Sequence, residues 1–187
     1  VGAGGGRFTK ELATIARSVV VVDISPEKLA RNRRNAEADG YAAAIETWQL
    51  GDLRDLKSQF PDGSFDAVVC YGGPLSIVSE DRRQASQELM RAARPGGLLF
   101  VSARSLWGTF HGHLPSVLRG DPHLNRDILA SGNLGPRTVG PASRFWHAYR
   151  ADEFRALFEE AGGEVVVLSA SDCLSSTWAD LMPTWRE

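Results

Sequence analysis

The sequence predicts an α/β fold, a three-layer sandwich in which helices cover both faces of a mainly parallel central sheet. Helical and strand patterns alternate along most of the 187 residues, as is typical of that class. Residues 19–22 are consecutive valines, and such a run fits a strand that is buried on both faces. Glycine and proline clusters separate the segments, as at residues 61–63, 72–74 and 95–97. The alternation therefore indicates parallel strands that are joined by helices.

The first part of the chain carries clear local signals for its elements. Phe8, Leu12 and Ile15 recur at helical spacing, so a helix should follow the opening glycines. Ser25 and Pro26 supply a capping hydroxyl and a first-turn proline, which predicts a helix from residue 26 to about residue 39. We further expect strands at residues 19–22, 45–50 and 65–71.

The second part begins with a predicted helix at residues 79–94, with acids near its start and arginines near its end. Pro95 and the two glycines after it should stop this helix before a strand at residues 98–103. Asp152 should cap a later helix whose apolar face includes Leu157. We also expect helices at residues 106–118 and about 125–130, and strands at residues 145–150 and 164–169.

The domain organisation expected is one domain over residues 1–187, with an insertion at residues 104–147. Glycine, proline and histidine become frequent in that insertion, which follows a strand end and is a candidate substrate lid. Only Val1 stands before the glycines, and residues 171–187 carry no clear strand pattern. The first and last strands of the sheet are therefore expected to be largely absent from this chain.

Composition restricts the partners that the chain can have. The net charge of −2 gives no basic excess, so no nucleic acid partner is expected. Cys70 and Cys173 lie far apart, which argues against a disulfide framework or a zinc site. The sequence shows no signal-peptide pattern and no apolar run that could cross a bilayer, and on these patterns we expect a cytoplasmic protein without membrane contact. Nothing in the sequence predicts the oligomeric state.

A glycine-rich loop is the first sign of a ligand site. Gly2, Gly4 and Gly6 form a GxGxG pattern ahead of a helix, and glycine lets the backbone approach a ligand closely. Asp23 follows about twenty residues later, at a strand end, where an acid can accept hydrogen bonds from ribose hydroxyls. This layout serves NAD and S-adenosylmethionine alike. Arg7 stands where the dinucleotide fingerprint needs a small residue, which counts against NAD.

Several segments, taken in order, resemble the motifs of class I S-adenosylmethionine-dependent methyltransferases. They are VGAGGGRFTKELA, VVVVDISPEKL, GDLRDL, PDGSFDAVVCYGGPLSIV and RAARPGGLLFVSAR, and the resemblance resumes at YRADEFRALFEEAGGEVVVL. The segments CYGGPLSIV and SLWGTF look like a group that acts on small molecules. The resemblance implies a Rossmann-like sheet, S-adenosylmethionine as the cofactor, and methyl transfer to a small-molecule acceptor.

The resemblance also implies a role for each residue that matches a motif. Asp23 would bind the ribose hydroxyls, and Asp52 would accept a hydrogen bond from the adenine amino group. Ile24 and Leu53 would lie against the adenine ring. The cofactor-binding residues that it implies are Gly2, Ala3, Gly4, Gly6, Asp23, Ile24, Asp52, Leu53, Tyr71 and Gly72.

The sequence does not select a general base. Its candidates are Tyr71, His111, His113 and His147, and a hydroxyl acceptor would need such a base. No metal site is expected, because two histidines spaced two apart on a helix point in different directions. Two other functions stay open at this point: an NAD(P)-binding oxidoreductase, and a degenerate or truncated methyltransferase-like domain without catalysis.

Overall fold

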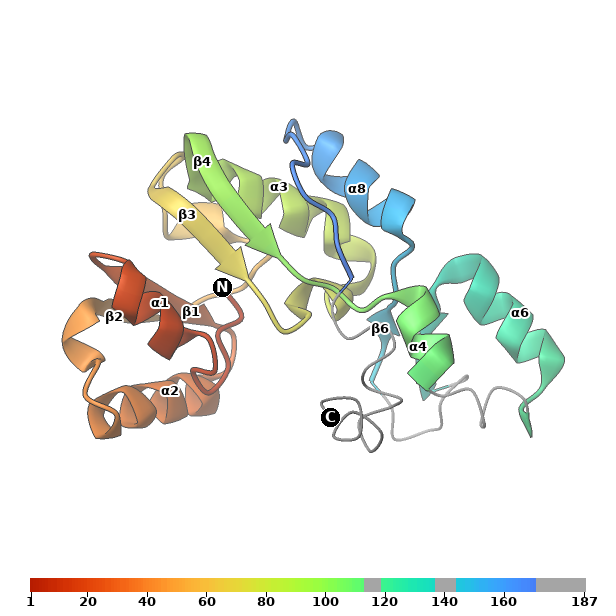
Figure 1. Cartoon of the computed structure of the whole chain (residues 1–187), viewed down its shortest axis with the longest axis horizontal. Helices are drawn as coiled ribbons and strands as arrows, with labels where there is room; N and C mark the ends of the chain where they lie inside the picture. Colours follow the sequence, from red (N-terminus) through yellow and green to blue (C-terminus); the bar gives the residue numbers. More distant parts are fainter. Residues whose placement is uncertain (113–118, 137–143, 171–187) are drawn as a thin grey trace, which may run out of the picture. The chain divides into compact units, whose positions relative to one another are not determined.

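The computed structural model describes residues 1–112, 119–136 and 144–170. The chain divides into two compact units, Val1–Ser102 and Ala103–Glu187. Figure 1 labels most of the helices and strands of both units.

The first unit opens with α1 (Thr9–Ile15), β1 (Val19–Asp23), α2 (Pro26–Ala38) and β2 (Ile45–Leu50). The two strands pair in parallel, as the red and orange part of Figure 1 shows. Asp23 lies opposite Leu50 at their ends. Helix α2 places Leu29 on Val21 and Ile45 in a small core. The Oγ atom of Ser25 accepts a hydrogen bond from the backbone N–H of Lys28, so the predicted cap of α2 is confirmed.

A second parallel pair follows in the same unit, formed by β3 (Phe65–Cys70) and β4 (Ala93–Val101) around α3 (Arg82–Ala92). The predicted helix end at residue 94 and strand start at residue 98 are wrong. The chain is already extended at Ala93, two residues before Pro95, because Ala93 pairs with Phe65 of β3. A register shift between Phe65 and Ala67 accommodates the extra residues of β4.

Single-turn 3₁₀ helices complete the first unit at Ala42–Ala44, Leu56–Ser58, Pro74–Ser76 and Ser79–Asp81. The parallel pairing, with helices in the connections, is the arrangement that the sequence predicted.

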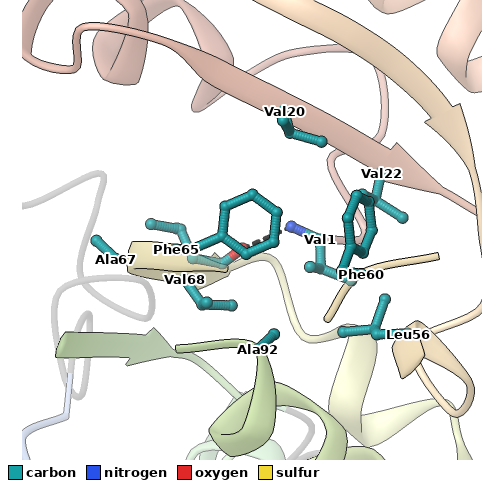
Figure 2. Close-up of a pocket in the computed structure, with 10 residues that line it drawn as sticks. Val1, Val20, Val22, Leu56, Phe60, Phe65, Ala67, Val68 and Ala92 are labelled. Carbon is teal, nitrogen blue, oxygen red and sulfur yellow. Dashed lines mark hydrogen bonds between the residues drawn. The ribbon is translucent and has the colours of Figure 1, made fainter. Parts of the chain in front are cut away.

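Residues 1–3 join the two parallel pairs. The N atom of Val1 donates a 2.7 Å hydrogen bond to the carbonyl of Val69 in β3. The N–H of Ala3 donates a 3.1 Å bond to the carbonyl of Val22 in β1. A small apolar cavity of about 50 Å³ lies beside this segment, and Figure 2 shows Val20 of β1 on one side of it.

The second unit contains α4 (Leu106–Gly112), α6 (Pro122–Ser131), β5 (Asn133–Leu134), β6 (Trp146–His147) and α8 (Ala151–Glu159). Strands β5 and β6 pair antiparallel. Leu106, Ile128, Leu134 and Ala148 form the buried core between these elements. The expected helix at 106–118 is present as α4, and its remainder lies outside the described residues.

Three boundaries predicted for the second unit need correction. The helix expected at 125–130 begins at Pro122, because Asp121 caps it by accepting from the N–H of His123. Helix α8 has Arg150 as its N-cap, so Asp152 lies in its first turn instead. The strand expected at 145–150 is limited to β6.

The strand expected at residues 164–169 is absent from the described structure. That segment has no regular hydrogen-bonding pattern, and Val166 and Val167 are 81% and 77% exposed. A run of apolar residues such as residues 165–168 does not form a strand without a neighbouring strand to pair with. Within the described residues, no helix has the length and apolar character needed to cross a bilayer.

Candidate cofactor site

The glycine-rich loop leaves open space above one of its residues. Gly2, Gly4 and Gly6 all have positive φ angles, of 65°, 56° and 98°. A Cβ atom on Gly2 would lie 2.4 Å from the Cγ atom of Pro74, so packing requires glycine there. At Gly4 a Cβ atom would meet nothing within 4 Å. A ligand can therefore approach the backbone most closely at Gly4.

Asp23 lies directly beside this loop, at the carboxyl end of β1. Its Oδ2 atom accepts a 2.7 Å hydrogen bond from the N–H of Gly4, and its Oδ1 atom accepts a 2.9 Å bond from the N–H of Ser25. The side chain is buried, and each carboxylate oxygen has capacity for a further donor. Ile24 next to it is 62% exposed. The structure thus places a carboxylate and an apolar surface side by side at the predicted position.

Asp52 follows β2 at the same edge, but an arginine already engages its carboxylate. The Nη2 atom of Arg54 lies 2.5 Å from Oδ2 of Asp52, and its Nη1 atom lies 3.0 Å from Asp81. Hydrogen bonds from Arg54 lower the pKa of Asp52 below its ordinary value. Leu53 is buried. Arg54 was not among the predicted site residues, and no local sequence signal marks its pairing with Asp52.

Tyr71 and Gly72 follow β3. The Tyr71 ring is 36% exposed and makes an edge-on contact with Phe8, with ring centroids 5.4 Å apart. The N–H of Gly72 donates a 3.0 Å hydrogen bond to the Oγ atom of Ser102. All the predicted cofactor residues lie in the first unit, in the opening loop, at the end of β1, or just after β1, β2 or β3. Carboxyl ends of parallel strands are where α/β sheets bind ligands.

The histidine candidates lie in the second unit. His147 is buried in β6, where its ring nitrogens lie 2.7 Å from Asn133 Oδ1 and 2.7 Å from Glu153 Oε1. His111 lies in the last turn of α4, and His113 lies outside the described residues. Among the described side chains, no group of three or more histidine, cysteine or acidic residues could hold a metal ion.

Comparison with known proteins assigns the family. The methyltransferase domain family matches residues 1–97, which is half of the chain and includes every predicted cofactor residue. The chain belongs to this methyltransferase family. This confirms the resemblance drawn from the motifs, and S-adenosylmethionine is the cofactor that it implies.

Curated relatives of this methyltransferase include two enzymes named for quinones. A demethylmenaquinone methyltransferase of Deinococcus radiodurans is 34% identical, over 76% of this chain and 58% of its own. A human mitochondrial 2-methoxy-6-polyprenyl-1,4-benzoquinol methylase is 39% identical over 42% of this chain and 23% of its own. An uncharacterised Mycobacterium tuberculosis protein is 28% identical over 72% of this chain. The chain spans about half the length of that mycobacterial relative.

Solved structures confirm the fold of the methyltransferase. An S-adenosylmethionine-dependent methyltransferase from Mesorhizobium loti superposes with a TM-score of 0.68 at 20% identity, over 98% of this chain and 82% of its own. One from Methanosarcina mazei gives 0.64 at 22% identity, over 86% and 76%. The Rossmann-like class predicted from the sequence is therefore correct.

Proposed function

We propose that this chain binds S-adenosylmethionine at the edge formed by the glycine-rich loop and Asp23, and transfers its methyl group to a small-molecule acceptor. The observation that carries the proposal is the hydrogen bond between Gly4 and Asp23, which joins the open loop to the acid at the end of β1. That pairing sets a backbone surface and a ribose acceptor side by side.

The residues present fit the parts of this cofactor. Gly2, Ala3, Gly4 and Gly6 would line its methionine and ribose portion, since Gly4 leaves the loop surface open. Asp23 would accept hydrogen bonds from the ribose hydroxyls through its remaining lone pairs. The exposed side chain of Ile24 supports a place against adenine.

The adenine amino group has Asp52 as its proposed acceptor. The guanidinium of Arg54 already donates hydrogen bonds to that carboxylate, so Asp52 would accept from both Arg54 and the adenine. Leu53 would lie beside the ring, and Tyr71 and Gly72 would lie near the methionine end.

The chemistry needed from the protein is mainly positioning. Bound S-adenosylmethionine supplies an electrophilic methyl carbon on a sulfonium, and displacement there is in line. The chain's part is to hold the acceptor behind that carbon and to exclude water. We propose residues 104–147 as the acceptor lid, with Trp107 among its contacts, because this side chain is 61% exposed on α4. Alanine at Trp107 should then weaken acceptor binding and leave S-adenosylhomocysteine affinity unchanged.

A hydroxyl acceptor would also need a base. Tyr71 is the candidate in the same unit as the proposed cofactor edge, and His111, His113 and His147 remain candidates in the second unit. The names of the Deinococcus and human relatives support a quinone-like aromatic acceptor for this chain as well. A cytoplasmic location stays a prediction of the sequence.

Calorimetric titration of the purified chain with S-adenosylhomocysteine tests the proposal, with NADH as comparator. We expect micromolar binding of S-adenosylhomocysteine, no binding of NADH, and loss of binding in Asp23→Ala. If the folded chain binds neither ligand, the result would indicate a non-catalytic domain. Binding of NADH alone would overturn the proposal and favour an oxidoreductase.

A further inference from the structure

A buried asparagine behind the glycine-rich loop connects that loop to the fold. Asn32 lies in α2 and is fully buried. Its Nδ2 atom donates to the carbonyl of Gly4 at 3.3 Å and to Thr9 Oγ1 at 3.0 Å. Its Oδ1 atom accepts a 3.1 Å hydrogen bond from the indole N–H of Trp48. One side chain on α2 therefore contacts the loop, α1 and β2.

These contacts hold the peptide groups of Gly4 from both sides. Its N–H donates to Asp23, and its carbonyl accepts from Asn32. Gly4 has a φ of 56°, and glycine has a wide range of other conformations to choose from. Two hydrogen bonds from opposite sides select one of them, and they do so at the residue that leaves open space for a ligand.

Asparagine matches this place chemically. Its amide offers two N–H donors, for Gly4 and Thr9, and an oxygen acceptor, for Trp48. Leucine has a similar size but would leave all three partners without their hydrogen bonds. Aspartate keeps the acceptor for Trp48 and can accept from the Thr9 hydroxyl, but ionised it offers no donor to the carbonyl of Gly4.

We infer that Asn32 is a positioning residue, which sets the conformation of Gly4 so that the loop can receive S-adenosylmethionine. This inference rests on the proposed function, in which the glycine-rich loop binds the cofactor. Asn32 acts on the cofactor through Gly4 and the loop, and α2 supplies the rigid support.

The test compares Asn32→Asp and Asn32→Leu with the control Ala36→Gly. Ala36 is also fully buried in α2, one turn further along, and glycine there weakens the helix without touching the loop contacts. Affinity for S-adenosylhomocysteine is measured by calorimetry below the melting temperature of every variant. The ¹⁵N–¹H resonance of Gly4 is recorded in each labelled chain.

We expect about a tenfold loss of affinity in both Asn32 variants, equivalent to about 1.4 kcal/mol. The Gly4 resonance should shift in both, while Ala36→Gly should keep wild-type affinity despite a lower melting temperature. Affinity within twofold of wild type in folded Asn32→Asp would overturn the inference, and so would an equal loss in Ala36→Gly. If the wild-type chain binds no S-adenosylhomocysteine, the proposed function fails. The Gly4 resonance then decides the inference, and an unchanged shift in Asn32→Asp overturns it.

Discussion

The N–H of Gly4 donates a 2.7 Å hydrogen bond to the Oδ2 atom of the buried Asp23 carboxylate. This bond joins the glycine-rich loop to the end of β1. Asp23 therefore stabilises the fold, in addition to the ribose contact that we propose for it. Substitutions of Asp23 should therefore change stability and cofactor affinity together.

Asp23→Asn should lower both the stability of the fold and the affinity for the cofactor. The amide keeps one oxygen for Gly4 or Ser25 but loses the charge that strengthens both hydrogen bonds. We expect the free energy of unfolding to fall by about 1–3 kcal/mol, measured by urea titration. S-adenosylhomocysteine affinity should fall at least tenfold at a temperature where the variant is folded. An unchanged affinity would mean that Asp23 does not contact the cofactor.

Alanine substitutions in the loop should distinguish backbone strain from ligand contact. Gly4→Ala adds a Cβ atom into open space, so its stability cost is that of a positive φ, about 1–2 kcal/mol. Gly2→Ala should cost more, because its Cβ atom would overlap Pro74. Gly40→Ala is the matched control for Gly4→Ala, with a φ of 79° and open space after α2.

Urea unfolding should give the same cost for Gly4→Ala as for Gly40→Ala, within about 0.5 kcal/mol. Calorimetry should show that S-adenosylhomocysteine affinity is lost in Gly4→Ala and kept in Gly40→Ala. Equal affinity in the two variants would mean that the ligand does not approach Gly4.

The sequence was sufficient for the features that depend on neighbouring residues. Neighbouring residues alone determine the run of four valines, the Ser25 cap and the spaced glycines. The structure has β1, α2 and the loop where these signals predicted them. The position of Asp23 beside Gly4 also followed, because a strand end and a loop at one sheet edge must meet. Roles for these residues in binding remain predictions.

Contacts between distant segments were not predictable in the same way. Nothing near Asn32 in the sequence indicates that its amide meets both Gly4 and Trp48, since α2 must first pack on the sheet. The boundary between α3 and β4 was missed because pairing with Phe65 extends the strand back to Ala93. Both failures arise where tertiary pairing overrides local preference.

Arg54 should control the ionisation of Asp52. Its hydrogen bonds lower the pKa of Asp52 below the ordinary value of 3.8, so Arg54→Met should raise that pKa toward 3.8. The pair stabilises the fold above pH 3.8, and that contribution is lost as the pH falls through the lower pKa of the folded state. Because the arginine side chain is 43% exposed, we expect only about 0.5 kcal/mol at neutral pH.

Carboxyl ¹³C titration by NMR measures the pKa of Asp52 directly in both chains. Urea unfolding at neutral pH and at pH 2 should show the stability difference between wild type and Arg54→Met shrinking toward zero in acid. A difference that stays constant over this range would mean that the pair does not form in solution.

Cys70 should be unreactive in the folded chain. Burial raises the pKa of its thiol to about 11, so about one thiol in a thousand is ionised at pH 8. In a Cys173→Ser background, which leaves Cys70 as the single thiol, iodoacetamide at pH 8 should label the chain only in denaturant. Mass spectrometry measures the modified fraction. Complete labelling within minutes under native conditions would contradict the burial of Cys70 at the end of β3.

His147 should stabilise the second unit. Replacing it by glutamine changes the geometry of its hydrogen bonds to Asn133 and Glu153, and it removes the ring that packs edge-on against Tyr149. We expect the free energy of unfolding to fall by about 2–3 kcal/mol in urea titrations, because buried polar partners would be left poorly satisfied. His123→Gln, at an exposed position in α6, should change the free energy of unfolding by less than about 0.5 kcal/mol.

S-adenosylhomocysteine affinity should stay at the wild-type value in both histidine variants. If His147→Gln leaves stability unchanged but abolishes methyl transfer, His147 is the base and its buried contacts contribute little to the fold.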